Sequence, residues 1–199
     1  MSIHFTVSRA IQFSLSALTI AALAACGGGG SSSAQLSGVA AYGAPMANAT
    51  VTLTDSNGTT KSATAANDGS YTLNVTGLTA PFLLKASGTS GDSVKEYTAL
   101  VLSAPQTGET ATANVTPLTH ALVTMVSSDG SSPKEFMDSS KLKSVDAAKL
   151  AAALSHLQTA LADVLANANL GSTFDPLKTP FKADRTSAAD VLLDTIKVS

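Results

Sequence analysis

Apolar and polar residues alternate in short runs between residues 34 and 114. Residues 50–54 and 70–75 show this most clearly, because every second side chain there is apolar. A period of two is typical of half-buried β-strands. Asn-Gly and Asp-Gly pairs within residues 55–58 and 67–69 favour tight turns between such strands. We expect strands at residues 50–54, 59–65, 70–75, 82–86, 95–103 and 111–115, with one more before them, and hence an all-β sandwich over residues 35–114.

From residue 116 onward the apolar period becomes that of a helix. Thr116-Pro117 is typical of a helix start, because threonine caps the N-terminus and proline fits the first helical position. A longer helix is expected from Asp146 to Leu170, with Gly171 as its stop. Ser187–Asp190 resembles a capping box and opens a third helix. We therefore predict an α+β chain with a small helical domain at residues 115–199. The apolar faces expected for the three helices are Leu118, Ala121, Leu122, Met125 and Val126; Leu150, Leu154, Leu157, Leu161, Val164, Leu165 and Ala168; and Val191, Leu192 and Ile196.

The leucine stripe of residues 150–165 has two interpretations. It either packs against the other two helices or forms a coiled-coil seam for a partner. Its length of about two to three heptads is below that of a sustained coiled coil, which favours packing within the chain. On that interpretation, Leu154→Ala and Leu161→Ala are each expected to cost about 2–5 kcal/mol.

The first 25 residues have the pattern of an export signal. Arg9 is their only Lys or Arg, and the apolar run at residues 10–22 is shorter than the about 20 residues of a bilayer span. Leu23, Ala24 and Ala25 then precede Cys26, the single cysteine of the chain. This stretch resembles the lipobox of bacterial lipoproteins. The alternatives are a secreted protein with an unrelated cysteine and an N-terminal transmembrane anchor.

The lipoprotein resemblance implies that residues 1–25 are removed and that Cys26 carries acyl chains such as palmitate. Two or more such chains give stable membrane anchoring. Residues 26–34 are rich in Gly and Ser and form a flexible tether, with a span of about 15 Å. Gly27 is not the aspartate that favours inner-membrane retention, so the resemblance implies the outer membrane of the cell envelope.

Charge and cysteine content narrow the functional classes. Without residues 1–25 the chain has 11 basic and 14 acidic residues, a net charge of −3. This balance argues against a nucleic-acid partner, which requires clustered Lys and Arg. A single cysteine permits no intrachain disulfide, so the folded part must be stabilised by core packing.

Two motifs in the β-rich segment carry a family resemblance. Gly43, Pro45 and Val51 lie in a Gly-x-Pro-x-x-x-Ala-x-Val motif, and residues 68–71 are Asp68-Gly69-Ser70-Tyr71. The pair resembles the carboxypeptidase regulatory-like domain, a transthyretin-like β-sandwich, over residues 35–104. The resemblance implies structural roles for these residues in turns and core, and no peptidase activity. Residues 114–119, Asn-Val-Thr-Pro-Leu-Thr, are similar to a recurring class of large exported bacterial lipoproteins.

Residues able to carry out chemistry are few. His120 and His156 are expected on the solvated sides of their helices, and His4 lies in the signal, so a zinc site is not expected. The turns at residues 55–58 and 67–69 contain oxygen ligands for calcium but lack the further ligands of an EF-type loop. No Gly-x-Ser-x-Gly motif and no acid–His–nucleophile pattern is present. We therefore expect no catalytic residue, no metal and no cofactor.

These observations predict a non-enzymatic, lipid-anchored envelope protein that acts as a binding or structural module for a protein or glycan partner. A second hypothesis follows from the expected last helix, which reaches Ser199 without a cap and suggests a longer parent protein. In that case the chain is the N-terminal part of an exported enzyme or adhesin whose active domain lies beyond residue 199. An adhesin would require repeats of the β-module, and the sequence contains one copy.

Overall fold

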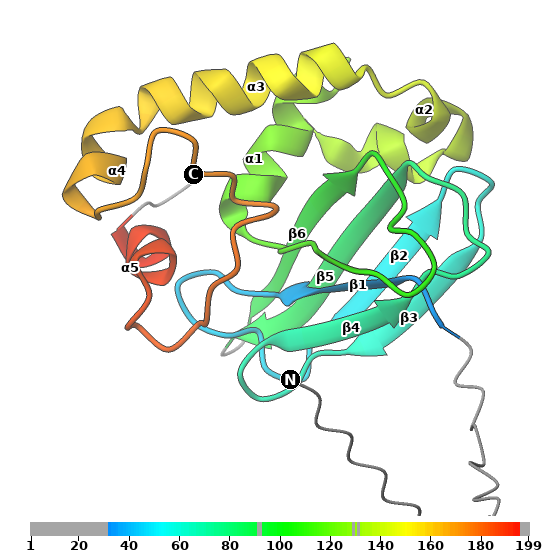
Figure 1. The fold of residues 1–199 in the computed structure, drawn as a ribbon, viewed down its shortest axis with the longest axis horizontal. Coiled ribbons are helices and arrows are strands. Elements are labelled where there is room, and N and C mark those ends of the chain that lie inside the picture. Colours follow the sequence, from blue (N-terminus) through cyan, green and yellow to red (C-terminus); the bar gives the residue numbers. More distant parts are fainter. Residues whose placement is uncertain (1–31, 91–92, 129, 131, 196–199) are drawn as a thin grey trace, which may run out of the picture. The chain divides into compact units, whose positions relative to one another are not determined.

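The computed structural model describes residues 32–195 apart from 91, 92, 129 and 131. Residues from Ser32 onward form one compact unit, in which two β-sheets and a set of helices pack together. Figure 1 shows most of the helices on one side of the strands, with α3 (Ala147–Ala160) farthest from the sheets and the red α5 (Ala188–Thr195) at their left. The predicted mixed α+β class is confirmed. The expected boundary between residues 114 and 115 falls inside this unit.

The strands lie close to the predicted positions. The smaller sheet has the order β4 (Ser70–Asn74), β1 (Gln35–Val39), β7 (Thr110–Thr112). The larger sheet has the order β3 (Thr60–Thr64), β2 (Thr50–Asp55), β5 (Phe82–Ser90), β6 (Ser93–Val101). Only the β1–β7 pair is parallel among these named strands, with Leu36 opposite Ala111.

The first residues of strand β5 separate two hydrophobic clusters because both faces of the strand are buried there. Phe82 and Leu84 point into a cluster shared by the two sheets, whereas Leu83 and Leu100 of β6 point into a second cluster beneath the helices. This is why Phe82-Leu83-Leu84 reads as a continuous apolar run rather than an alternation. The molecule therefore has three layers: small sheet, large sheet and helices.

The helices begin mostly where the sequence predicts, and two were not expected. Helix α1 (Pro117–Val126) has Thr116 as its N-cap, and α3 has Asp146. The unexpected elements are the 3₁₀ helix η1 (Pro133–Met137) and the short helix α2 (Ser139–Lys143). Both are short and have no apolar stripe to reveal them. The remaining helices are α4 (Ala162–Asn167) and α5 (Ala188–Thr195).

The single helix expected from Asp146 to Leu170 is interrupted. Leu161, with φ −101° and ψ 9°, separates α3 from α4. The stop is Asn169 rather than Gly171, because Asn169 takes the left-handed conformation at φ 55°. Leu170 N–H then donates to Leu165 O at 2.8 Å, as in a Schellman motif. Asparagine tolerates this conformation better than other non-glycine residues.

Two predicted apolar faces are rotated from the expected ones. In α1, Met125 is 52% exposed and Val123 is buried, because α1 packs against both β6 and α3. In α3 and the residue after it, Leu157 is buried whereas Leu154 and Leu161 are only partly buried. A truncation of Leu154 or Leu161 therefore removes less buried surface than the expected 2–5 kcal/mol requires.

Candidate binding site

An apolar groove lies between α3, α1 and the end of the larger sheet. Its volume is about 530 Å³, which is within the usual range for small-ligand pockets. Leu122 and Val123 of α1 form one wall and Leu150 and Leu154 of α3 another. The segment Leu102–Pro105, which follows β6, closes a third side. The partial exposure of Leu150 and Leu154 follows directly, since both face this groove.

The loop of residues 175–178 borders the groove and is fixed by one buried side chain. Asn114 is 1% exposed, and its Nδ2 donates to Pro176 O at 3.1 Å and to Thr179 O at 2.8 Å. Its Oδ1 accepts the N–H of Val39 at 3.2 Å. The amide of Asn114 thus connects β1 to the loop that borders the groove.

The polar groups that line the groove differ in how fully they are engaged. The hydroxyl of Thr119 donates to Thr98 O at 2.9 Å and accepts the N–H of Thr116 at 2.8 Å. Asp175 Oδ1 accepts the N–H of Leu177 at 2.9 Å and that of Lys178 at 3.4 Å. Within the described part of the chain, the ion pairs are Lys85–Glu96 and Arg185–Asp194, so the Lys178 ammonium has no carboxylate within 4.0 Å. Lys178 is therefore a charged group available at the edge of an apolar groove.

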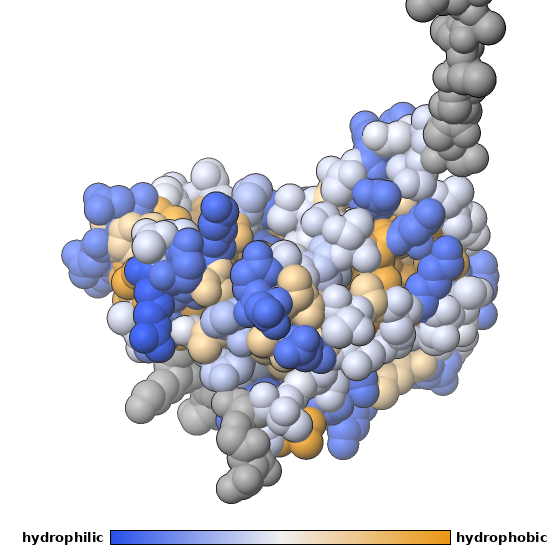
Figure 2. All heavy atoms as spheres, turned by 90° about the horizontal axis from the view of Figure 1, so that it is seen from below, coloured by the Kyte–Doolittle hydropathy of each residue, from blue (hydrophilic) through white to orange (hydrophobic). Residues whose placement is uncertain are grey.

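The exposed large apolar side chains outside the groove are scattered. The face in Figure 2 shows small hydrophobic areas separated by hydrophilic residues. Isolated exposed apolar residues are normal on protein surfaces. The five most exposed come from five different elements: Val94, Met125, Met137, Val164 and Val191.

The six signature residues lie in turns and core, away from the groove. Gly69 has φ 79°, and a Cβ there would lie 2.5 Å from Ala40 O and 3.3 Å from the Cβ of Pro45. The two sequence motifs therefore meet in space at Gly69 and Pro45. Val51 is fully buried in β2. The hydroxyl and N–H of Ser70 donate to Asp68 and hold the pKa of that carboxyl below its usual value.

Tyr71 is the polar member of the core between the sheets. Its ring is 4% exposed and its hydroxyl donates to Ala113 O. Burial raises the pKa of the Tyr71 hydroxyl, so this group stays protonated and serves as a donor. The bond ties β4 to the segment that follows β7.

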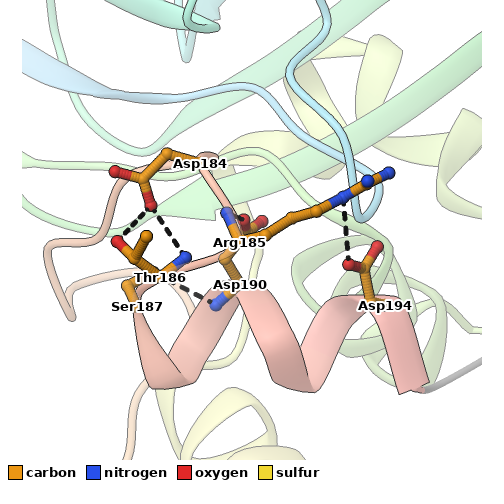
Figure 3. A network of polar contacts seen from close by, with 6 residues as sticks. All are labelled: Asp184, Arg185, Thr186, Ser187, Asp190 and Asp194. Atoms are coloured by element: carbon orange, nitrogen blue, oxygen red, sulfur yellow. Dashed lines mark hydrogen bonds and ion pairs between the residues drawn. The ribbon is translucent and has the colours of Figure 1, made fainter.

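The Gly43 turn contacts α5 and a set of charged residues. Gly43 has φ 94°, and a Cβ there would lie 2.5 Å from Oδ1 of Asp194. Figure 3 shows Arg185 extended along α5 toward Asp194, with Nε and Oδ2 3.6 Å apart. The expected capping box is only half formed. Ser187 Oγ accepts the Asp190 N–H at 3.4 Å, but Asp190 Oδ2 accepts the N–H of Arg185, at 2.6 Å.

Asp190 is a buried carboxyl group with one unsatisfied oxygen. It is 0% exposed, and Oδ1 has no hydrogen-bond partner among the described residues. Burial raises the pKa of Asp190; the Arg185 N–H opposes this effect, and the negative charges of Asp194 and Asp184 add to it. Keeping Asp190 ionised therefore costs folding free energy.

We predict a pH dependence of stability from Asp190. Because its pKa is higher in the folded than in the unfolded chain, the free energy of unfolding falls as pH rises from the ordinary carboxyl value to the folded one. The Asp190→Asn variant lacks this contribution. Its unfolding free energy relative to the wild type is therefore expected to increase over that window, as measured by urea unfolding at a series of pH values.

Asp184→Asn is the matched control for Asp190→Asn. The Thr186 hydroxyl, at 2.6 Å, and the Thr186 N–H hold the pKa of Asp184 below its usual value. The sign is opposite, because a lowered pKa stabilises the fold above the ordinary carboxyl value and this contribution is lost on acidification. A parallel response of the two variants would contradict the assignment.

His120 is not solvated as the helical pattern predicts. It is half-buried between α1 and β6, where its Nδ1 lies 3.1 Å from Oγ1 of Thr98. Its ring meets that of Tyr97 edge-on, with centroids 6.0 Å apart. Burial lowers the pKa of His120. The error arose because α1 presents two faces, one to β6 and one to α3.

The other residues considered as metal ligands either have hydrogen-bond partners within the fold or lie exposed on the surface. His156 is exposed, as predicted. Asp55 is buried; burial alone would raise its pKa, but N–H donors from Thr79, Thr59 and Asn57 hold it below the usual value. The carboxylate of Asp55 is thus used within its turn. No group of three or more His, Cys, Asp or Glu residues suited to a metal ion occurs in the described part.

The lipobox residues Leu23, Ala24, Ala25 and Cys26 lie outside the described residues. Over residues 32–195, excluding the four positions not described, no helix has the length and apolar character needed to span a bilayer. Comparison of the chain with protein-family models, with curated proteins and with solved structures found no match.

Proposed function

We propose that this chain is a lipid-anchored protein of the cell envelope whose folded part is a non-catalytic binding module. The observation that carries the binding role is the groove of about 530 Å³ beneath α3. Its lining is mainly aliphatic, and the Thr119 hydroxyl and the Asp175 carboxylate are already hydrogen-bonded to the backbone. Such a lining is suited to holding an apolar group and poorly suited to a glycan, which requires many free hydrogen-bonding groups.

The fold proposed for this module is a transthyretin-like sandwich with helices packed on its larger sheet. Two features support it. Leu36 of β1 and Leu84 of β5 belong to one hydrophobic cluster, as facing sheets require. The close approach of Gly69 to Pro45 also brings together the two motifs that carry the family resemblance.

Membrane anchoring is proposed from the sequence around Cys26. A thiolate is a strong nucleophile and accepts the diacylglyceryl group in lipoproteins. The absence of aspartate at position 27 supports the outer membrane as the location. The tether predicted at residues 26–34 would then lift the folded part off the lipid headgroups, with Ser33 and Ala34 held to that part by hydrogen bonds.

Acyl labelling of cells that express the full chain tests the anchor. We expect labelled palmitate to appear on the wild-type protein and to be lost in Cys26→Ser, which also keeps its signal as a larger precursor. Ser31→Ala, in the same tether, is the control and should label like the wild type. Equal labelling of the wild type and Cys26→Ser would contradict the anchor, as would a wild-type protein whose mature N-terminus is not Cys26.

A further inference from the structure

We propose that the groove beneath α3 binds the single acyl chain of an anionic amphiphile, a long-chain carboxylate. This inference rests on the proposed function, because it takes the groove to be the binding site of the module. It adds the chemical class of the ligand and the side chain that selects the ligand's head group.

The lining of the groove matches a hydrocarbon chain. Leucine, valine and alanine side chains from α1, α3 and the segment after β6 surround it, and none of the described residues that line it is aromatic. Ala147 and Ala151 have small side chains, so that space remains between α3 and Leu102–Pro105. Burial of each methylene group in such a site increases affinity by a factor of about four.

The charge at the edge of the groove selects the head group. Lys178 has no ion pair within the described residues, whereas Asp175, three residues earlier, is engaged by backbone N–H groups. One free ammonium group suits one negative charge. Asp175 also lines the groove, and its carboxylate repels a doubly charged phosphate more strongly than a singly charged carboxylate. A fatty-acid carboxylate satisfies both conditions.

The groove lies next to the point where the tether leaves the folded part. The segment after β6 forms a wall of the groove with Leu102–Pro105 and then pairs with the first described residues. Gly108 N–H donates to Ser33 O at 3.3 Å, and Gln35 N–H donates to Glu109 O at 2.9 Å. Only six residues separate Cys26, the proposed anchor, from Ser33. An anchored protein would therefore keep the groove within reach of amphiphiles that leave the membrane.

Photolabelling of the full lipidated chain in phosphatidylcholine vesicles tests the proposal. The probe is palmitate with a diazirine at the end of its chain, and labelled peptides are identified by mass spectrometry. We expect labelling of peptides that contain residues 100–105 and 147–154. Unlabelled palmitate should compete with the probe. Labelling spread evenly over exposed residues would overturn the proposal.

Two neighbouring alanines provide a matched pair of variants. Ala151 and Ala152 are both exposed on α3, but only Ala151 lines the groove. Ala151→Phe should fill the groove and reduce its labelling at least tenfold, whereas Ala152→Phe should label as the wild type does. An equal effect of the two variants would contradict the site.

The head-group assignment is tested separately with Lys178→Gln. We expect labelling by the carboxylate probe to fall about fivefold, as for an exposed ion pair, and labelling by its methyl ester to stay unchanged. Lys149→Gln, on α3 outside this groove, is the charge control. Equal loss with both probes, or no loss with either, would overturn the role of Lys178.

The Cys26→Ser variant distinguishes the two sources of an acyl chain. Equal labelling of the groove in the wild type and Cys26→Ser supports a free carboxylate. Labelling that occurs only in Cys26→Ser would show that the protein's own anchor occupies the groove, and would overturn the proposal. The intact mass of each protein reports acylation of Cys26 independently, so a failed anchor and an empty groove give different results.

Discussion

Gly38→Ala is expected to lower the free energy of unfolding by about 4 kcal/mol, more than overpacking usually costs. A Cβ on Gly38 would lie 1.9 Å from Ala113 O and 2.5 Å from the carbonyl carbon. This carbonyl cannot move freely. The Ala113 oxygen accepts a hydrogen bond from the Tyr71 hydroxyl, and the Ala113 N–H donates to Ser37 O at 2.9 Å. Relief of the clash therefore breaks contacts in both β1 and β4.

Thermal and urea unfolding measure this effect. For a chain of this size, 4 kcal/mol corresponds to a fall in Tm of about 8–16 °C. Gly171→Ala is the control, because a Cβ there has no neighbour closer than 3.8 Å and Gly171 is exposed. It should be neutral or slightly stabilising. A loss below about 1 kcal/mol for Gly38→Ala would show that the segment after β7 does not cross β1 as closely as described.

The strands were predictable from the sequence because each is limited by a local signal. Gly58 and Gly69 lie in turns, with φ 84° and 79°. Strand β2 ends before the first turn, and β4 begins directly after Gly69. The start of α1 was equally clear, since Thr116 accepts the N–H of Thr119 as a cap should. Such signals act over three or four residues, and a sequence pattern contains all of the residues involved.

The packing of the helices was not predictable in the same way. The side of α1 that is buried depends on β6 and α3, and these segments are distant in sequence from one another. Hence Met125 is exposed and His120 is half-buried, contrary to the helical pattern. A helical wheel describes one apolar face, whereas α1 has contacts on two.

The groove itself left only an indirect signal in the sequence. Leu150 and Leu154 read as core residues of a helix, and their stripe is indistinguishable from one that packs fully. The groove exists because Leu102–Pro105 and the loop of residues 175–178 approach α3 without filling the space beside it. Both segments lack a periodic pattern. The side chain that holds the second one, Asn114, was visible only as part of a motif.

Asn114→Asp is expected to destabilise the fold by about 4 kcal/mol at neutral pH, by removing two donors from a buried site. Asn114 Nδ2 donates to Pro176 O and Thr179 O, at 3.1 and 2.8 Å. A carboxylate in its place would face two carbonyl oxygens and leave both without a hydrogen bond. It would still accept the N–H of Val39, so the loss concerns the loop of residues 175–178 specifically.

The pH dependence separates this explanation from a general loss of packing. Aspartate has nearly the volume of asparagine, so a packing defect would be small and independent of pH. A buried carboxyl facing carbonyl oxygens is favoured in its protonated form, which donates one hydrogen bond, and so its folded pKa is raised. The deficit of Asn114→Asp should therefore shrink as pH falls toward the ordinary carboxyl value. Asn74→Asp is the control: Asn74 is exposed and its Oδ1 accepts the Thr76 N–H at 2.9 Å, a bond that aspartate retains. A deficit for Asn114→Asp that stays constant between pH 4 and pH 7 would contradict a donor role for Asn114, and with it the fixed position of the loop beside the groove.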